Sequence, residues 1–340
     1  MDTLETRKIT AKAPTRIDFA GGWTDTPPFS TEHGGSVVNA AISLCVEVEI
    51  TLGRTGRHRN VTIRSVDYGT TVEANNIPSL KLDGHADFPK AALKSLPVKS
   101  PIEIVTSSDA PPGSGLGGSG ALGVALVAAL SVARGDNLIG REVPERAHAI
   151  EVDELRVLGG KQDQYAAMFG GFRYMRFRDP VVEMFPLPLL DITIDKLRLN
   201  SLLVYTGQPR TSGDIHQNVV GAYNSGNRAT LRALDELKTA ADKMRHALLA
   251  NDLGLFAELL NSNWQAQKAL HPSITNERIE KAFSIALSHG ALAGKALGAG
   301  GGGCLYFFCG NGARDDVGKA LGDAGFRILD FDFEFRGLRC

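Results

Sequence analysis

The chain has 340 residues, of which 43% are hydrophobic and 22% charged, as in an ordinary globular protein large enough for two domains. Its formal net charge of −1 provides no overall field that would attract nucleic acid or an anionic membrane. It shows neither an apolar run of membrane-spanning length nor a signal peptide at its first residues. We therefore expect a cytoplasmic protein without nucleic-acid or membrane partners, and we make no prediction of its oligomeric state.

Residues 9–28 predict a strand that ends in a glycine turn, followed by a polar loop. The loop brings an aromatic ring, a hydroxyl and a carboxylate together in Trp23, Thr24 and Asp25. Aromatic faces stack on the C–H surfaces of sugars, and carboxylates accept hydrogen bonds from vicinal hydroxyls, so the three residues suit a sugar site. A turn with a core Trp and a capping Asp explains them equally well.

The next segments predict β-structure. Residues 37–52 form a β-rich run whose second half alternates apolar and polar side chains, which is typical of a half-buried antiparallel strand. We expect residues 60–65 to return as its partner. Residues 102–107 predict a further strand, which stands just before a glycine-rich stretch.

The glycine-rich stretch runs from Asp109 to Leu130 and carries the strongest signal in the chain. Five glycines and two serines lie between residues 113 and 120, and an uninterrupted apolar run follows at once. The run predicts a buried helix that begins in the glycines. The free N–H groups and the dipole of a helix start bind phosphate, which a flexible Gly/Ser linker would not do.

Two common phosphate-loop patterns fit this stretch poorly. A P-loop needs a lysine after its last glycine, and residues 109–133 contain neither Lys nor Arg. The dinucleotide fingerprint G-x-G-x-x-G matches at Gly113, Gly115 and Gly118, but two prolines separate the expected strand from the first glycine. The alternative interpretation, an NAD-dependent dehydrogenase, has only that fingerprint to support it.

A carboxylate framed by two amides follows the next predicted helix. Residues 144–158 predict this helix, and the sequence GGKQDQ then places Asp163 just beyond a glycine turn. Asp163 could cap the following helix or could serve as a catalytic carboxylate.

The second half predicts a strand over 197–207 and then a helical region. Four helices are expected there, over residues 214–225, 228–250, 253–270 and 276–288. Four consecutive glycines, 300–303, lead straight into an apolar strand, and residues 327–335 predict the last strand. A plain tight turn does not need four glycines.

Three of these segments resemble the motifs of the GHMP kinases, named for galactokinase, homoserine, mevalonate and phosphomevalonate kinases. Residues 111–120 resemble the loop P-x-x-x-G-L-G-S-S-A, with Gly118 and Gly120 in place of its first Ser and its Ala. Residues 13–25 resemble the first motif of the family, and residues 295–303 resemble the third, K-x-x-G-A-G-G-G-G. The segments GGKQDQ and TGQPRTS (206–212) resemble the fucokinase and heptose-phosphate kinase branch.

The resemblance implies a two-domain α+β protein with ATP and Mg²⁺ as cofactors. It implies an N-terminal ribosomal-protein-S5-like ATP-binding domain over residues 1–195 and a C-terminal ferredoxin-like α/β domain over 196–340. The active site would lie between the domains.

The resemblance also assigns roles to individual residues. Asp163 would be the catalytic base with Arg16 beside it, and Ser119 and Glu151 would bind Mg²⁺, with Asp153 and Glu154 as alternatives to Glu151. The acceptor would contact Trp23, Thr24, Asp25, Arg210, Gly301 and Gly302. The ATP phosphates would contact Pro112, Gly113, Ser114, Gly115, Leu116, Gly117, Gly118, Ser119 and Gly120.

The activity that the resemblance implies is transfer of the γ-phosphate of ATP to a sugar hydroxyl. The expected acceptor is the anomeric hydroxyl of a heptose 7-phosphate, and a free sugar, as in fucokinases and galactokinases, is the alternative. A non-catalytic sugar or ATP sensor of the same fold is a further alternative, because Gly118 and Gly120 depart from the usual loop.

Overall fold

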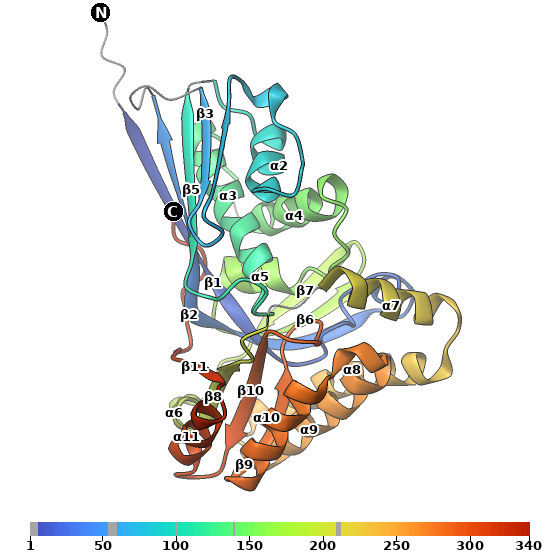
Figure 1. Cartoon of the computed structure of the whole chain (residues 1–340). Helices are drawn as coiled ribbons and strands as arrows, with labels where there is room; N and C mark the ends of the chain where they lie inside the picture. The colour runs from blue at the N-terminus through green and yellow to red at the C-terminus, as the bar shows by residue number, and fades with distance from the viewer. Residues whose placement is uncertain (1–5, 54–59, 100, 139, 209–211) are drawn as a thin grey trace, which may run out of the picture.

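The computed structural model describes residues 6–53, 60–99, 101–138, 140–208 and 212–340 (Figure 1). Two sheets with helices packed on them build this part of the chain, which confirms the predicted α+β class. The larger sheet contains β1 (Arg7–Ala20), β2 (Gly35–Leu52), β3 (Val61–Ser65), β4 (Thr70–Ala74), β5 (Ile102–Ser108), β6 (Phe172–Arg178) and β7 (Val181–Pro186). The smaller sheet contains β8 (Ser201–Tyr205), β9 (Ala291–Ala296), β10 (Cys304–Cys309) and β11 (Arg327–Leu329).

The helices alternate with these strands along the chain. They are α1 (Phe29–Glu32), α2 (Asp87–Ser95), α3 (Gly118–Arg134), α4 (Glu142–Ala149), α5 (Gln162–Phe169), α6 (Asp191–Asn200), α7 (Ser212–Asn224), α8 (Arg228–Leu249), α9 (Leu253–Leu270), α10 (Glu277–Ser288) and α11 (Arg314–Asp323). The four helices predicted for the second half are confirmed as α7 to α10. Among the described residues, no helix combines the length and apolar character needed to cross a bilayer.

The 18-residue strand β2 holds the larger sheet together. The strand order is β4-β3-β5-β2-β6-β7, and β1 pairs with β2 in addition. The C-terminal part of β2 pairs with β5 and its N-terminal part pairs with β6, while β1 runs antiparallel along nearly its whole length. The smaller sheet has the order β11-β8-β10-β9.

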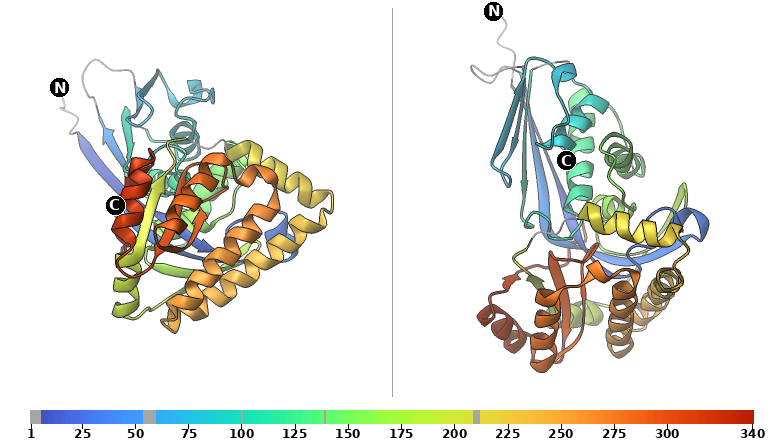
Figure 2. Two further views of the ribbon diagram at one scale, coloured as in Figure 1. Left: turned by 60° about the horizontal axis from the view of Figure 1, so that its bottom comes forward. Right: turned by 45° about the vertical axis from the view of Figure 1, so that its right-hand side comes forward.

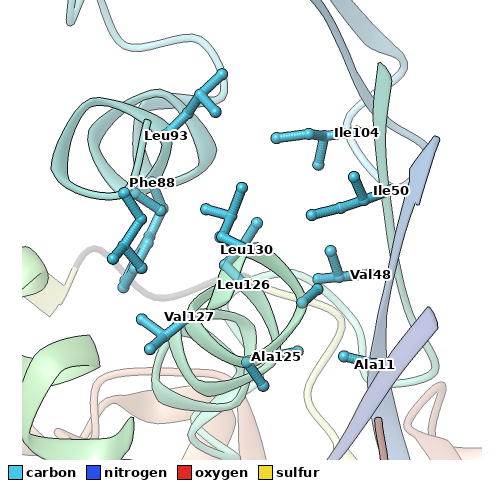
Figure 3. Packing of buried hydrophobic residues seen from close by; sticks show 14 of the residues in the cluster. Ala11, Val48, Ile50, Phe88, Leu93, Ile104, Ala125, Leu126, Val127 and Leu130 are labelled. Atoms are coloured by element: carbon cyan, nitrogen blue, oxygen red, sulfur yellow. The ribbon is translucent and has the colours of Figure 1, made fainter. Parts of the chain in front are cut away.

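The helix that follows the glycine-rich stretch, α3, is the centre of the first hydrophobic core. The helices α2, α3 and α4 lie on one face of the larger sheet (Figure 2, right). Figure 3 shows Leu126 and Leu130 of α3 directed toward Val48, Ile50 and Ile104 of the sheet, all of them buried. This apolar packing holds the N-terminal end of α3, and the glycines before it, in a fixed place relative to the sheet.

Three predictions about the strands are corrected. The segment predicted as the partner of β2 is β3, but it pairs with β4 and β5, and β5 separates it from β2. An alternating pattern predicts a strand but does not name its neighbour. Residues 197–200 end the helix α6 instead of starting a strand, because the buried Thr193 and Leu197 follow a helical spacing. The last strand ends at Leu329.

The chain after β11 returns from the smaller sheet to the larger one. Phe333 forms a β-bridge with Ile42, and Arg339 forms another with Lys12. The C-terminus therefore lies beside β1 and β2 (Figure 1). The predicted domain boundary, at residue 195, falls within α6 and stays a prediction.

Candidate active site

The glycine-rich loop and the glycine tetrad meet between the two sheets. The backbone N–H of Cys304, at the start of β10, donates a hydrogen bond to Ser114 O at 2.6 Å. A Cβ on Gly303 would lie 2.6 Å from Ser114 O and 2.8 Å from Gly113 O, so only glycine allows this approach. In Figure 1 the start of α3, α5 and the upper end of β10 come together here. Two motifs about 190 residues apart thus form one site.

Arg16 and Asp163 form an ion pair beside the loop. Arg16 lies on β1, with its side chain 4% exposed, and Asp163 lies in the first turn of α5, with its side chain 25% exposed. Arg16 Nη2 and Nε lie 2.6 and 2.8 Å from Asp163 Oδ1. Arg16 Nη1 donates to Gly115 O at 2.6 Å, and the backbone N–H of Arg16 donates to Leu116 O at 2.9 Å. The guanidinium therefore connects the loop with the carboxylate.

Two glycines of the loop region make room for Asp163. Gly117, whose φ is +77°, caps the N-terminus of α3, and a Cβ there would lie 3.0 Å from Asp163 Cγ. A Cβ on Gly120 would lie 2.6 Å from Asp163 Cβ. Gly120 takes the place of the alanine in the family loop, and this contact explains why the chain has glycine there. The carboxylate thus packs directly against the first turn of α3.

Ser119 and Glu151 lie together on the same side of α3. Glu151 occupies a π-helical turn (Ile150–Glu154) after α4, and its Oε1 accepts a short hydrogen bond from Ser119 Oγ. Gln164 Nε2 donates to Glu151 Oε2 at 2.6 Å. Burial raises the pKa of Glu151 to about 7, while the hydrogen bond from Ser119 acts in the opposite direction. The other two carboxylates considered for this role, Asp153 and Glu154, are exposed.

Asp25 is a buried carboxylate held by the first residue of α5. Gln162 donates its backbone N–H to Asp25 Oδ2 at 3.2 Å and its Nε2 to Oδ1 at 3.3 Å. A Cβ on Gly160 would lie 2.0 Å from Asp25 Oδ2, which explains this glycine. Burial, with the charge of Asp163 nearby, raises the pKa of Asp25 to about 7. Asp25 and Asp163 are therefore neighbours in the site.

Trp23 and Thr24 fill structural positions in the turn. Trp23 is 7% exposed and belongs to the apolar cluster around β8 and β10, with its ring centroid 4.6 Å from that of His216. Thr24 is fully buried, and its Oγ1 donates to Gly21 O and accepts from the backbone N–H of Ser36. The structure thus shows both residues shaping the turn, and their contact with a sugar stays a prediction.

The remaining predicted acceptor contacts are Gly301, Gly302 and Arg210. The backbone N–H of Gly301 donates to Ile274 O at 2.7 Å, and Asn276 Nδ2 donates to Gly301 O at 3.0 Å. Gly301 and Gly302 lie in the tetrad beside the glycine-rich loop, but their role stays a prediction. Arg210 lies outside the described residues.

Sequence reasoning did not assign roles to the amides that orient the carboxylates. Gln162 and Gln164 flank Asp163 in sequence, and the structure shows that each of them holds a different carboxylate, Asp25 and Glu151. Asn39 Nδ2 donates to Gln162 Oε1 at 3.4 Å. The sequence Gln-Asp-Gln at the start of a helix could have indicated these roles, because successive side chains in a helix point in different directions and can contact different partners.

Comparison with known proteins places this arrangement in a family. Residues 87–171 match the GHMP kinases N terminal domain and residues 244–327 match the GHMP kinases C terminal domain. The chain is 31% identical, over 98% of each chain, to D-glycero-alpha-D-manno-heptose 7-phosphate kinase of Campylobacter jejuni. The chain belongs to the GHMP kinases. This kinase is therefore a phosphotransferase with an alcohol group as acceptor, which excludes the dehydrogenase alternative.

Other relatives of the kinase agree. It is 30% identical to the L-fucokinase/L-fucose-1-P guanylyltransferase of Bacteroides fragilis, over 90% of this chain and 35% of that one. The crystal structure of a D-glycero-D-manno-heptose 1-phosphate kinase from Bacteroides thetaiotaomicron superposes with a TM-score of 0.79, at 29% identity and over 97% of both chains. The GHMP kinase fold predicted from the motifs is thereby confirmed.

Proposed function

We propose that this GHMP kinase transfers the γ-phosphate of ATP to the anomeric hydroxyl of a heptose 7-phosphate. The observation that carries the proposal is the position of Asp163, which Arg16 holds directly against the first turn of α3. A phosphate bound by that turn and a hydroxyl beside Asp163 would be neighbours. The similarity to a heptose 7-phosphate kinase over nearly the full length supports the acceptor.

Asp163 is the base in this mechanism. Its Oδ1 is engaged by Arg16, and its Oδ2 lies on the side of Gly117 and the glycine-rich loop. Oδ2 accepts the proton of the acceptor hydroxyl as the oxygen attacks the γ-phosphorus, and the positive charge of Arg16 offsets the negative charge that develops. An anomeric hydroxyl is more acidic than an ordinary alcohol, so it needs only a moderate base.

The ATP phosphates would bind at the loop from Pro112 to Gly120. The first turn of α3 has backbone N–H groups without partners inside the helix, and the helix dipole adds positive charge. A Cβ on Gly118 would meet no atom within 4 Å, so the space outside this turn is open to a ligand. Positioning and charge compensation of the phosphates are the main contributions of a protein to phosphoryl transfer.

The residues around Ser119 fit a magnesium ion. The hydroxyl of Ser119 and the carboxylate of Glu151 supply oxygen ligands, which Mg²⁺ prefers, and Gln164 Oε1 is buried there without a hydrogen-bond partner among the described residues. One or two carboxylates together with substrate phosphates are a usual Mg²⁺ environment. Bound with ATP, Mg²⁺ would neutralise charge on the phosphates.

The acceptor would bind between Asp163 and Asp25. Asp25 can accept hydrogen bonds from vicinal hydroxyls, with Gln162 fixing its orientation. Lys161, a nearby cation, already donates to Glu145 at 2.8 Å, so it is not a free ligand for a phosphate on the sugar. We assign that role to Arg210 of the segment TGQPRTS. Residues 1–195 and 196–340 would form the two domains on either side of the acceptor.

The experiment that tests this proposal measures ADP release from Mg-ATP with a panel of sugars. The panel contains heptose 7-phosphate, unphosphorylated heptose, fucose, galactose and mannose, and a parallel titration measures sugar binding. We expect turnover with heptose 7-phosphate in clear preference to the others. Turnover with a free sugar alone would contradict the assigned acceptor, and sugar binding without ADP release would indicate the sensor.

A further inference from the structure

A buried ion pair connects the two sheets next to the turn that carries Asp25. Lys295 lies on β9 of the smaller sheet and Asp18 on β1 of the larger one. Lys295 Nζ donates to Asp18 Oδ2 at 2.8 Å and to the backbone Asp18 O at 3.0 Å. The two side chains are 1% and 2% exposed. None of the reaction steps proposed above uses either residue.

Because the ion pair is buried, it is expected to add little to the free energy of unfolding. Removing two charges from water costs several kcal/mol per ion, and apolar residues of similar volume often stabilise a protein as well or better. Burial also lowers the pKa of Lys295. Asp18 Oδ1 is buried and has no hydrogen-bond partner in the described part of the chain, so only one of the two carboxylate oxygens, Oδ2, accepts a hydrogen bond from Lys295. The position of the pair points to a role other than stability.

Asp18 contacts the turn that carries Asp25, and Lys295 lies on the strand that leads into the glycine tetrad. A Cβ on Gly22 would lie 2.1 Å from Asp18 Oδ2, so the turn that carries Asp25 rests on the Asp18 carboxylate. Asp18 follows Arg16 by two residues on β1, so both side chains lie on the same face of the sheet. Lys295 lies five residues before the glycine tetrad, and the last glycine of the tetrad, Gly303, lies against Ser114 of the glycine-rich loop.

We propose that Asp18 and Lys295 are positioning residues, whose ion pair holds the turn at Asp25 in place against the tetrad for acceptor binding. The inference rests on the proposed role of Asp25. Without the Lys295 ammonium, the Asp18 carboxylate is left buried and uncompensated, and the turn that rests on it shifts. We expect a smaller effect on the ATP side, because the apolar packing of α3 on the larger sheet holds the start of that helix separately from the pair.

Lys90 provides a matched control. Like Lys295 it is a lysine with a side chain 1% exposed, and it is paired with Asp83 and Asp87. It lies on α2, which is beside the end of the larger sheet that points away from the smaller sheet (Figure 1). Lys90→Met should therefore lower the Tm and leave the kinetic constants unchanged, whereas an effect on acceptor binding should be specific to Lys295→Met.

The test compares wild type, Lys295→Met, Asp18→Asn, the double variant and Lys90→Met by thermal unfolding and steady-state kinetics. We expect Lys295→Met to raise the KM of the sugar about tenfold or more, with the KM of ATP within about threefold. The double variant should recover part of this loss, since it leaves neither charge unpaired. If Lys295→Met does not fold, Asp18→Asn, which keeps the shape of the side chain, gives the same readout.

Each outcome bears on the inference. A variant of the pair that loses Tm like Lys90→Met but keeps the KM of the sugar would overturn the positioning role. Equal increases in the KM values of the sugar and of ATP would also overturn it, because they would indicate a general disturbance. If the wild-type protein turns over none of the sugars, the proposed kinase activity is wrong. The wild-type assay therefore distinguishes failure of the proposed function from failure of the positioning role.

Discussion

Arg16 Nη2 and Nε both contact the same oxygen of Asp163, Oδ1, at 2.6 and 2.8 Å. The same guanidinium donates to Gly115 O in the glycine-rich loop at 2.6 Å. The loop thus sets the position of Arg16, and Arg16 sets the position of Asp163. The other oxygen, Oδ2, lies on the side of Gly117, and in the mechanism that we propose it accepts the proton of the acceptor hydroxyl.

Replacing Asp163 with asparagine removes the proposed proton acceptor and keeps the shape of the side chain. We expect kcat to fall by about 10²- to 10⁴-fold. The KM of ATP should change little, since the glycine-rich loop is intact. Steady-state ADP release measures both constants. Asp67→Asn, which alters an exposed carboxylate in the same half of the chain, is the control and should retain wild-type kcat.

Gly120→Ala places a Cβ 2.6 Å from Asp163 Cβ and should displace the base. We expect kcat to fall by about 10- to 100-fold, since small misplacements of reacting groups are costly. Gly123→Ala is the control, because it introduces a clash of the same size in the same helix, 2.6 Å from Phe88 Cζ.

Gly123→Ala should destabilise the protein by about 1–3 kcal/mol without slowing the reaction. Chemical denaturation and kcat, measured on both glycine variants, distinguish the two effects. Equal kcat values in both variants would argue against a role for the contact between Gly120 and Asp163.

Glu151→Gln should weaken the response to magnesium. The amide keeps the hydrogen-bonding shape but loses the charge that suits a divalent cation, so we expect about tenfold more Mg²⁺ for half-maximal activity. ADP release at fixed ATP and varied free Mg²⁺ gives this concentration. Glu154→Gln, at an exposed position of the same turn, should behave as wild type. The reverse result would assign the ion to Glu154.

The buried Asp25 should make stability depend on pH. Its pKa is raised in the folded protein from 3.8 to about 7, so the folded state holds a proton that the unfolded chain releases between these values. The resulting stabilisation is present below pH 3.8 and is lost as the pH rises to about 7. Asp25→Asn stays uncharged, so its stability relative to wild type should increase with pH.

Unfolding experiments on Asp25→Asn and wild type at pH 5 and pH 8 measure this effect. From the linkage relation we expect the advantage of the variant to grow by about 2–3 kcal/mol between about pH 5 and pH 8. Asp153→Asn, at an exposed position, is run in parallel. A difference between Asp25→Asn and wild type that stays constant with pH would show that Asp25 titrates normally.

The sequence predicted the parts of the site that lie within continuous motifs. The helix start at Gly118 and the strand that follows the tetrad were predictable because glycine runs beside long apolar segments leave few alternatives. The family resemblance implied an active site between the domains, but the contact of the two glycine motifs at Ser114 was not predicted. The pairing of β3 with β5 was not predictable, since strand partners depend on contacts far apart in sequence.

The supporting residues were harder to predict than the motifs. Asp18 and Lys295 are separated by 277 positions, and no local pattern joins them. Trp23 suited a sugar-stacking ring in sequence, but the structure buries it against His216 and leaves it 7% exposed. Burial of this kind depends on the packing of the whole chain, which a turn of a few residues does not encode.

The most direct test of the proposed activity is phosphorus NMR of the product formed from Mg-ATP and heptose 7-phosphate. We expect a new phosphate monoester resonance coupled to the anomeric proton, formed together with an equal amount of ADP, and formed about 10²-fold or more slowly with Asp163→Asn. A newly formed phosphate monoester coupled to a proton at a carbon other than the anomeric one, or release of inorganic phosphate alone, would contradict transfer to the anomeric hydroxyl.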